Sequence, residues 1–211
     1  MPTFSEEFLL LALSDPKGGF VREPPERFEN ALAGAILMDL ALLNRIDNDL
    51  DHLILVDASP TGDPLLDRAL TAIREYPDSK STAYWIEEIR YRIDEFREVL
   101  IRRLIDRGML KREDKKLLGI IPQTRYAVSP GPEEREVRER LRAMILSDDI
   151  PDPKDVLLIS LLVSCSLIDR LFSRAESEAA QDRIDQISQM DLIGQAVFKT
   201  ILREIVIPIS Y

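Results

Sequence analysis

Residues 28–43, FENALAGAILMDLALL, decide the fold, because an apolar stretch of this length predicts a long buried helix. Its apolar positions at helical spacing are Ala31, Leu32, Ile36, Leu37, Leu40 and Leu43. They cover most of the circumference of a helix with about 3.6 residues per turn. A helix that is apolar nearly all round is surrounded by other elements. The small residues at 31–35, ALAGA, let those neighbours approach closely. We therefore expect a central helix around which the other elements pack.

Helix-start signals on both sides of this stretch predict further helices. Thr3 and Glu6 have the spacing of a capping box in front of an apolar run. Asp63 followed by Pro64, and the pair Asp152-Pro153, each combine a capping carboxylate with proline at the first helical position. Residues 156–168 form an uncharged apolar run that is too short to span a bilayer, so we expect a buried core helix there.

The remaining segments predict a small β component and more helices. Leu53–Val56 is expected to be a strand, and residues 109–128 a β-hairpin around Gly119. Residues 81–107 are expected to be helical with a break near Tyr91, and the tail from Ala175 to form two helices. The fold class is therefore mainly α: a single globular helical domain over residues 1–211, with about eight helices and a small β-hairpin.

Composition excludes several classes of function. The net charge of −10 repels nucleic-acid phosphates, so we expect no nucleic-acid partner. A winged-helix arrangement of helix and hairpin over residues 97–128 contains nine basic residues, but four acidic residues lie among them. A single cysteine, Cys165, lies in an apolar run and is expected to be a buried small side chain. With no basic leader, the chain is expected to be cytoplasmic, possibly peripheral on the inner membrane face.

Signatures of catalysis and of metal binding are absent from the sequence. His52 is the only histidine and is expected to lie on the surface. Common zinc sites need more cysteine and histidine than this chain has. The loop 59–64, SPTGDP, has one glycine and no Gly-Lys-Ser/Thr ending, so it is expected to be a turn into a helix cap. We expect no catalytic residues, no metal and no cofactor.

Five segments, in order along the chain, carry a resemblance to a known family. They are residues 6–13 (EEFLLLAL), 32–42 (LAGAILMDLAL), 60–67 (PTGDPLLD), 97–110 (REVLIRRLIDRGML) and Asp152-Pro153 before a long apolar helix. Together they resemble the Golgi phosphoprotein 3 family, from Glu6 to about Leu202, and the compact chain looks like a prokaryotic member. The resemblance implies a mainly helical fold with a hairpin used in self-association. It also implies peripheral membrane proteins that bind phosphatidylinositol 4-phosphate and grip enzyme tails and coat proteins.

The lipid pocket implied by the resemblance can be followed position by position. Its tryptophan falls at Pro24, its central-helix arginine at Ala33, and its two later arginines at Asp94 and Arg97. Only Arg97 keeps its residue type, and Asp94 at i, i+3 is expected to pair with it. A phosphomonoester site needs several converging donors, each worth about 1.5–3 kcal/mol. The substitutions therefore predict a weakened site for that lipid, with Arg97 as its remaining head-group candidate.

The predicted hairpin contains four apolar residues that are expected to be covered by another surface. They are Leu117, Leu118, Ile120 and Ile121. They are expected to form a homo-oligomer contact, a membrane-inserting tip or part of the core. Trp85, on a predicted helix, is expected to pack in the core rather than to serve as the pocket tryptophan.

Three functions remain open from the sequence. The first is a non-enzymatic peripheral membrane module that binds an anionic phospholipid head group near Arg97. The second is a protein–protein adaptor without a lipid role, which the lost cations and the charge of −10 favour. The third is an enzyme acting on a lipid or sugar precursor, which would require carboxylates from distant segments to converge in one cleft.

Overall fold

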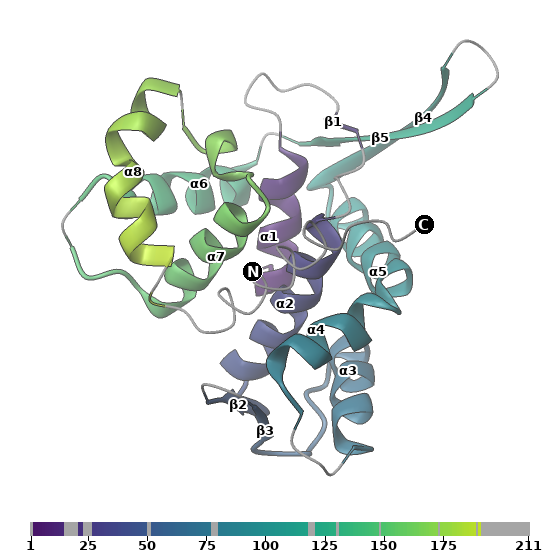
Figure 1. Cartoon of the computed structure of the whole chain (residues 1–211). Helices are drawn as coiled ribbons and strands as arrows, with labels where there is room; N and C mark the ends of the chain where they lie inside the picture. The colour runs from purple at the N-terminus through teal and green to yellow at the C-terminus, as the bar shows by residue number, and fades with distance from the viewer. Residues whose placement is uncertain are drawn as a thin grey trace, which may run out of the picture.

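The structure of this chain is a computed structural model that describes residues 2–14, 21–22, 27–49, 52–76, 80–117, 121–129, 131–147, 149–172, 174–188 and 190. Within these residues there are eight α-helices, one short 3-10 helix and five strands (Figure 1). The predicted class, mainly α with a small β-hairpin, is confirmed. The second helix expected in the tail lies outside the described residues.

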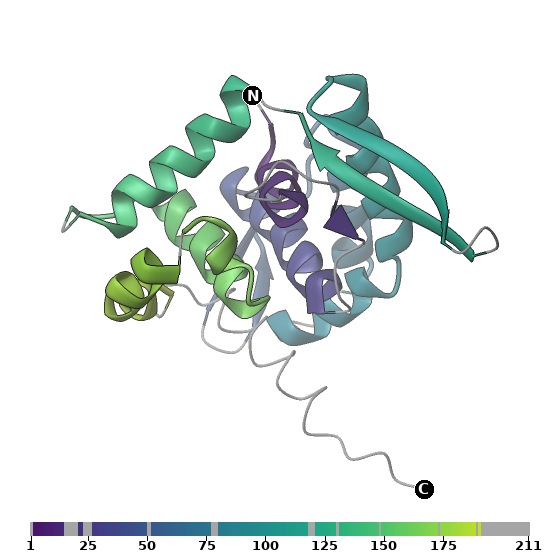
Figure 2. The same ribbon diagram turned by 90° about the horizontal axis from the view of Figure 1, so that it is seen from above.

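The centre of the molecule is a pair of buried helices, α1 (Phe4–Leu13) and α2 (Arg27–Leu42). Five of the six apolar positions that predicted a central helix are buried in α2, which confirms the helix, but Leu43 lies after its end and is 44% exposed. All ten residues of α1 are buried as well. The rings of Phe8 and Phe28 stack with centroids 5.4 Å apart, which holds the two helices together. Both views show α1 and α2 enclosed by the other helices (Figures 1 and 2).

Polar side chains satisfy the amino-terminal end of α1, as a buried helix end requires. The predicted capping box is present: the Glu6 N–H donates to Thr3 Oγ1, and the Thr3 N–H donates to Glu6 Oε2 at 2.9 Å. The N–H groups of Phe4 and Ser5 donate to the two carboxylate oxygens of Asp39 on α2, at 2.8 and 3.0 Å. Burial raises the pKa of Asp39 above its ordinary value of 3.8, although the hydrogen bonds from Ser5 and Phe4 act in the opposite direction.

Arginines satisfy the other end of α1. The guanidinium of Arg170 donates to the carbonyl oxygens of Ala12 and Ser14. Arg138 donates to Ser14 Oγ at 2.6 Å and to Glu134 Oε1 at 2.7 Å. The carboxyl-terminal elements are therefore fixed to α1 by charged hydrogen bonds as well as by apolar contact.

Helices on two sides cover the central pair (Figure 2). On one side lie α3 (Pro64–Arg74), α4 (Thr82–Arg90) and α5 (Ile93–Asp106). On the other lie α6 (Pro132–Ile145), α7 (Pro153–Ser164), the 3-10 helix η1 (Ile168–Arg170) and α8 (Arg174–Ser188). The break predicted near Tyr91 separates α4 from α5, and the caps predicted at Asp63 and Asp152 both accept hydrogen bonds from backbone N–H groups.

A second group of buried charges joins α1 to α6 and α7. Glu7, which is 1% exposed, accepts from Lys154 Nζ at 2.7 Å and from Arg140 Nη2 at 3.2 Å. Arg140 Nε also donates to Asp155 Oδ1 at 2.9 Å. Because buried carboxylates need paired cations, these contacts fix how α6 and α7 sit on α1.

Two small antiparallel sheets complete the fold. The predicted hairpin is β4 (Leu110–Leu117) paired with β5 (Ile121–Val128), and β1 (Val21–Arg22), which was not predicted, pairs with β5. The predicted strand near Leu53 is β3 (Leu53–Leu55), and it pairs with an unpredicted strand, β2 (Ile46–Asn48). Figures 1 and 2 show the β4–β5 hairpin extending away from the helices.

Three single-residue predictions are confirmed. Cys165 and Trp85 are buried, at 4% and 2% exposed, and His52 lies on the surface. Trp85 makes edge-on contacts with the rings of Tyr76 and Tyr84, so it belongs to the core between α3 and α4. Among the described residues, no helix has the length and apolar character that crossing a membrane requires.

The substitution Asp39→Ala should destabilise the protein, because the buried N–H groups of Phe4 and Ser5 would lose their acceptor. At about 1–3 kcal/mol per unsatisfied buried group, we expect a loss of about 3 kcal/mol in the free energy of unfolding, measured by urea titration. The control is Asp106→Ala, an exposed aspartate at the end of α5, which should change the free energy by less than about 0.5 kcal/mol. Equal effects of the two substitutions would contradict this role of Asp39.

Candidate functional site

Arg97, the head-group candidate, lies in a set of ion pairs. Its Nη2 donates to Asp94 Oδ1 at 2.7 Å, so the predicted i, i+3 pair is confirmed. Its Nη1 lies 3.7 Å from Glu29 Oε1 on α2, and Arg90 Nε lies 3.7 Å from the other oxygen of Glu29. The Arg97 side chain is only 16% exposed. A phosphate approaching Arg97 would therefore meet two carboxylates that already use the guanidinium.

The other positions implied by the resemblance do not complete a phosphate site. Ala33 is fully buried on α2 and offers no polar atom from its side chain. Pro24 lies outside the described residues. Of the four aligned positions, the structure therefore brings together Asp94 and Arg97, whose charges cancel. Whether lipid binds here stays a prediction.

The hairpin residues are described only in part. Leu117 and Ile121 form the last pair of the β4–β5 register. Leu118 and Ile120 lie outside the described residues, as do the side chains of Leu117 and Ile121. The oligomer or membrane contact expected for these four residues therefore stays a prediction.

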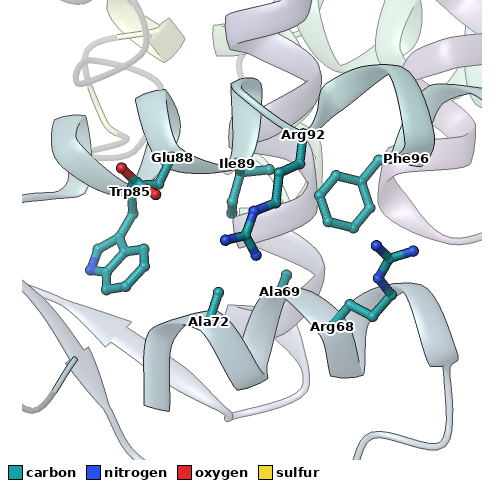
Figure 3. A pocket seen from close by; sticks show the side chains of 8 residues that line it. All are labelled: Arg68, Ala69, Ala72, Trp85, Glu88, Ile89, Arg92 and Phe96. Atoms are coloured by element: carbon teal, nitrogen blue, oxygen red, sulfur yellow. The ribbon is translucent and has the colours of Figure 1, made fainter. Parts of the chain in front are cut away.

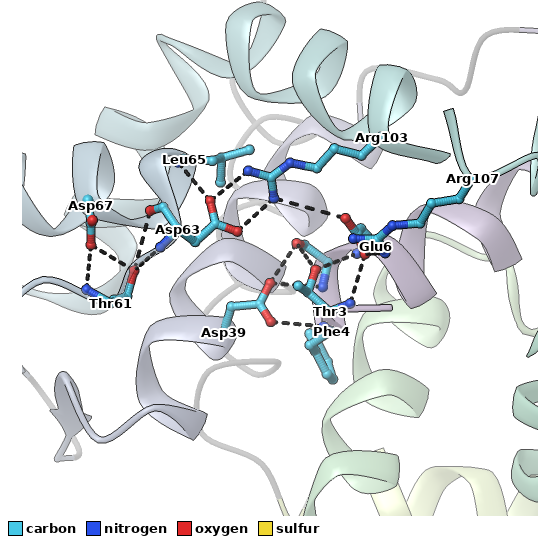
Figure 4. Close-up of polar contacts among 11 residues, drawn as sticks. Thr3, Phe4, Glu6, Asp39, Thr61, Asp63, Leu65, Asp67, Arg103 and Arg107 are labelled. Carbon is cyan, nitrogen blue, oxygen red and sulfur yellow. Dashed lines mark hydrogen bonds and ion pairs between the residues drawn. The ribbon is translucent and has the colours of Figure 1, made fainter. Parts of the chain in front are cut away.

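The motif at 60–67, the most specific part of the family resemblance, forms internal contacts (Figure 4). The N–H and hydroxyl of Thr61 donate to Asp67 Oδ1 at 2.6 and 2.7 Å. Asp63 accepts from the Leu65 N–H at 2.8 Å, which confirms the predicted turn and helix cap. Gly62 has φ of +85°, a left-handed conformation that favours glycine. The motif thus specifies the start of α3 rather than a phosphate-binding loop.

A chain of charged contacts connects this motif to α1 and α5. Arg103 of α5 donates to both carboxylate oxygens of Asp63, at 2.6 and 2.7 Å, and lies 4.0 Å from Glu6. Arg107, one turn later, donates to Glu6 Oε2 at 2.6 Å. Burial alone would raise the pKa of Asp63, but the hydrogen bonds from Arg103 and from the backbone outweigh it and lower that pKa. These residues therefore hold three helices together.

A groove on α3, α4 and α5 is the candidate site that the geometry defines. At one end is a narrow slot of about 20 Å³, whose apolar lining is Ala69, Ala72, Trp85, Ile89 and Phe96. At the other end is a shallow, open depression of about 540 Å³ at the turn between α4 and α5, lined by Glu88, Tyr91, Arg92, Asp94 and Glu95. Glu88 and Arg92 line both parts, so the slot and the depression are continuous. Figure 3 shows Trp85 and Phe96 at opposite ends of the slot.

The groove has an uneven distribution of charge. Three carboxylates and one guanidinium line the depression. Glu95 pairs with Arg68 at 2.5 Å, and that hydrogen bond lowers the pKa of Glu95. Asp94 pairs with Arg97. Tyr91, at 92% exposed, offers an open aromatic ring beside these carboxylates. The depression thus favours a cation, and the slot beside it favours a small apolar group.

Sequence reasoning did not find this groove. The predictions that Trp85 is buried and that a helix breaks near Tyr91 are both correct. Neither prediction indicates that these residues lie beside α3. The pairing of small residues Ala69 and Ala72 against Trp85 depends on how α3 crosses α4.

The described residues contain no cluster of histidine, cysteine, aspartate and glutamate that could hold a metal ion.

The fold and groove define a class: mainly α-helical, with a projecting hairpin and a surface groove as the candidate site. The chain belongs to the Golgi phosphoprotein 3 (GPP34) family, whose sequence profile matches residues 4–203. The vacuolar protein sorting-associated protein 74 of Eremothecium gossypii is 31% identical over 169 residues. That alignment covers 71% of this chain and 49% of the relative, so it spans about half the length of the curated relative. The family resemblance of the five motifs is therefore confirmed.

The pair of Asp63 and Arg103 should contribute to stability in a pH-dependent manner. We expect Arg103→Gln to reduce the free energy of unfolding at pH 7 by about 2 kcal/mol, the scale of a partly exposed charged hydrogen bond. Because the folded state lowers the pKa of Asp63, this contribution is present above the ordinary value of 3.8 and is lost as the pH falls through the lower folded value. Urea titrations from pH 7 to pH 2.5 should show the difference from the unsubstituted protein shrinking.

The control for this experiment is Arg102→Gln, which removes the neighbouring, exposed arginine on the same helix. Its effect should stay below about 0.5 kcal/mol. A difference for Arg103→Gln that stayed constant down to pH 2.5 would contradict the assigned ion pair, because protonation of Asp63 would then have no effect.

Proposed function

We propose that this chain is a non-enzymatic adaptor that holds a short cationic segment of a client protein in the groove on α3, α4 and α5. The observation that carries the proposal is the groove itself, an apolar slot continuous with a depression lined by three carboxylates and Tyr91. A segment with one apolar side chain followed by basic residues matches this order. The apolar side chain would enter the slot, and the cations would lie beside Glu88 and the ring of Tyr91.

Charge supports this function over one that depends on phosphate. A cation entering the depression meets three carboxylates and one guanidinium. Two of these carboxylates, Asp94 and Glu95, already pair with Arg97 and Arg68, so Glu88 is the acid that we expect to receive the cation. The whole chain carries −10, so the approach of a cationic segment is favoured over a longer range as well. An anionic ligand would meet both effects with the opposite sign.

The comparisons support a role in handling other proteins. The relative from Eremothecium gossypii is named for vacuolar protein sorting, and gripping a client is what such sorting requires of an adaptor. The family resemblance also implies members that bind enzyme tails.

Binding of an anionic phospholipid head group is the second candidate function, favoured by the retained Arg97. Against this function, carboxylate oxygens of Asp94 and Glu29 lie 2.7 and 3.7 Å from the Arg97 guanidinium that a phosphate would need. A head group would have to compete with two carboxylates already in place. Self-association through the β4–β5 hairpin, which projects from the helices, also stays a prediction (Figure 1).

Peptide binding tests the adaptor function directly. The probe is a capped five-residue peptide with one alanine, whose methyl group suits the narrow slot, followed, after a glycine, by two arginines and a final glycine. It is titrated by calorimetry at low salt. We expect saturable binding that Glu88→Gln weakens about ten-fold, since about 1.4 kcal/mol of charged interaction corresponds to that factor. Ala72→Leu, which fills the slot, should weaken binding as strongly.

The matched control is Glu87→Gln, the exposed glutamate next to Glu88 but outside the groove. It removes the same charge from the same helix and should leave the affinity within two-fold. A second control replaces both peptide arginines with glutamate and should not bind. If Glu87→Gln and Glu88→Gln weakened binding equally, only the overall charge would matter and the groove would be excluded as the site.

Vesicle co-sedimentation separates the adaptor from the lipid-binding candidate. The two vesicle types are phosphatidylcholine alone and phosphatidylcholine in which about one lipid in twenty is phosphatidylinositol 4-phosphate. We expect the unsubstituted protein to sediment equally and weakly with both types at low salt. The physical reason is the pairing of Arg97 with Asp94 and Glu29. Strong sedimentation on the phosphoinositide vesicles that Arg97→Gln abolished, and that Arg102→Gln retained, would favour the lipid-binding function instead.

A further inference from the structure

The β2–β3 hairpin and the adjoining end of α2 carry five exposed apolar side chains. They are Leu42, Leu43, Ile54, Leu55 and Val56, with exposed fractions from 37% to 58%. Single exposed apolar residues are ordinary, but these belong to two stretches that the backbone joins, because the Val56 N–H donates to the Arg45 carbonyl at 2.9 Å. Figure 1 shows β2 and β3 at the end of the molecule opposite to the β4–β5 hairpin.

The edge of β3 has open backbone groups beside these side chains. In the antiparallel register Asp47 faces Ile54, and Ile46 faces Leu55. The Val56 N–H donates to the Arg45 carbonyl and the Asp49 N–H to the His52 carbonyl, so these two facing pairs are hydrogen-bonded. Hydrogen-bonded and non-hydrogen-bonded pairs alternate along antiparallel strands, so the pair of Ile46 and Leu55 is not hydrogen-bonded. The N–H and C=O of Leu55 therefore face away from β2. Leu53, two residues earlier, uses its outward N–H on the Lys80 carbonyl at 2.9 Å, and Asp57, two residues later, donates its N–H to the Arg45 carbonyl at 3.1 Å. The open backbone groups on this edge are therefore the N–H and C=O of Leu55.

A cavity follows directly along the chain from this edge. It has a volume of about 80 Å³ and is lined by Ala58, Pro60, Asp67, Leu70, Thr71 and Arg74. The α3 residues of this lining lie on the side of that helix opposite to Arg68, Ala69 and Ala72, which line the groove. The open edge and this cavity therefore form a second surface, separate from the groove.

We propose that the open edge of β3 binds an extended segment of another protein as an added antiparallel strand, and that this segment alternates apolar and basic residues. The N–H and C=O of Leu55 supply the backbone hydrogen bonds, and the exposed Ile54 and Val56, which share one face of the strand, supply apolar contact. One apolar side chain of the segment enters the cavity lined by Ala58 and Leu70.

Charge selects this occupant over a second copy of the chain. The carboxylates of Asp47, Asp49 and Asp57 lie on or beside the hairpin, and Asp57 is 44% exposed although it pairs with Arg45. Two copies meeting edge to edge would bring these acids together, and each copy carries −10 overall. Basic residues on a different chain would instead face them. This inference does not depend on the proposed use of the groove.

The test uses a synthetic peptide of seven residues that alternates lysine and valine, begins and ends with lysine, and is blocked at both ends. Its affinity is measured by fluorescence anisotropy at low salt for the full chain. The key variant is Leu55→Pro, which removes the outward N–H without removing a bond inside the β2–β3 hairpin. A peptide with the same side chains but with alternate backbone nitrogens methylated reports whether backbone hydrogen bonds matter.

We expect saturable binding that Leu55→Pro weakens at least ten-fold and that backbone methylation of the peptide weakens to the same degree. The double substitution Ile54→Ser with Val56→Ser leaves the backbone unchanged and guards against misfolding of the proline variant. It should also weaken binding at least ten-fold, whereas Val99→Ser, at an exposed apolar position on α5, should leave it within two-fold.

Two results would overturn the proposal. The first is equal binding of the methylated and unmethylated peptides, which would reduce the interaction to non-specific charge attraction. The second is concentration-dependent self-association, measured by sedimentation velocity, that Leu55→Pro abolishes, because the edge would then pair with a second copy of the chain. Loss of groove binding in the Glu88→Gln variant has no bearing on either result.

Discussion

The burial of α1 depends on one interaction, the acceptance of its first two free N–H groups by the carboxylate of Asp39. A helix whose ten residues are all buried cannot leave its terminal donors to water, so another element must supply the acceptor. That element is α2, and the bonds of 2.8 and 3.0 Å fix the position of α1 along it. The burial that raises the pKa of Asp39 is the cost of this arrangement, which the hydrogen bonds from Ser5 and Phe4 partly offset. Helices α3 to α7 then pack against a pair whose relative position is already set, and α8 packs against α6 and α7.

The same end of α1 gives the most specific sequence motif a structural role. Glu6 belongs to the capping box, yet it also receives Arg107, and Arg103 links it to Asp63 in the turn before α3 (Figure 4). A residue that holds three helices together is constrained as strictly as one that binds a ligand. The motif at 60–67 therefore identifies the family through its architecture. The groove proposed to hold a client segment is formed by other residues of α3, α4 and α5.

Much of the fold was predictable from local patterns, because caps and helical periodicity depend on neighbours in sequence. The capping box at Thr3, the proline-led helices and the break at Tyr91 all depend on residues within one or two turns. Of the pair β2 and β3, only β3 was predicted, because a three-residue strand such as β2 gives too little alternation of apolar and polar residues to recognise. The groove was missed for a different reason. Ala72, Trp85 and Phe96 come from three helices, and only the crossing of those helices brings them to one slot.

The distribution of cations favours one of the two proposed kinds of ligand. Arg97, Arg103, Arg107, Arg138, Arg140 and Arg142 each lie within 4 Å of at least one carboxylate oxygen. These arginines serve the packing of α1, α5 and α6, so releasing one to bind a phosphate would leave a carboxylate without its partner. For Glu6 and Glu7, which are at most 1% exposed, such a loss would strand a buried charge. A cationic ligand requires no such release, because it adds a partner for carboxylates on the surface. The engagement of these six arginines in ion pairs therefore supports the proposed binding of basic segments over the binding of phosphate.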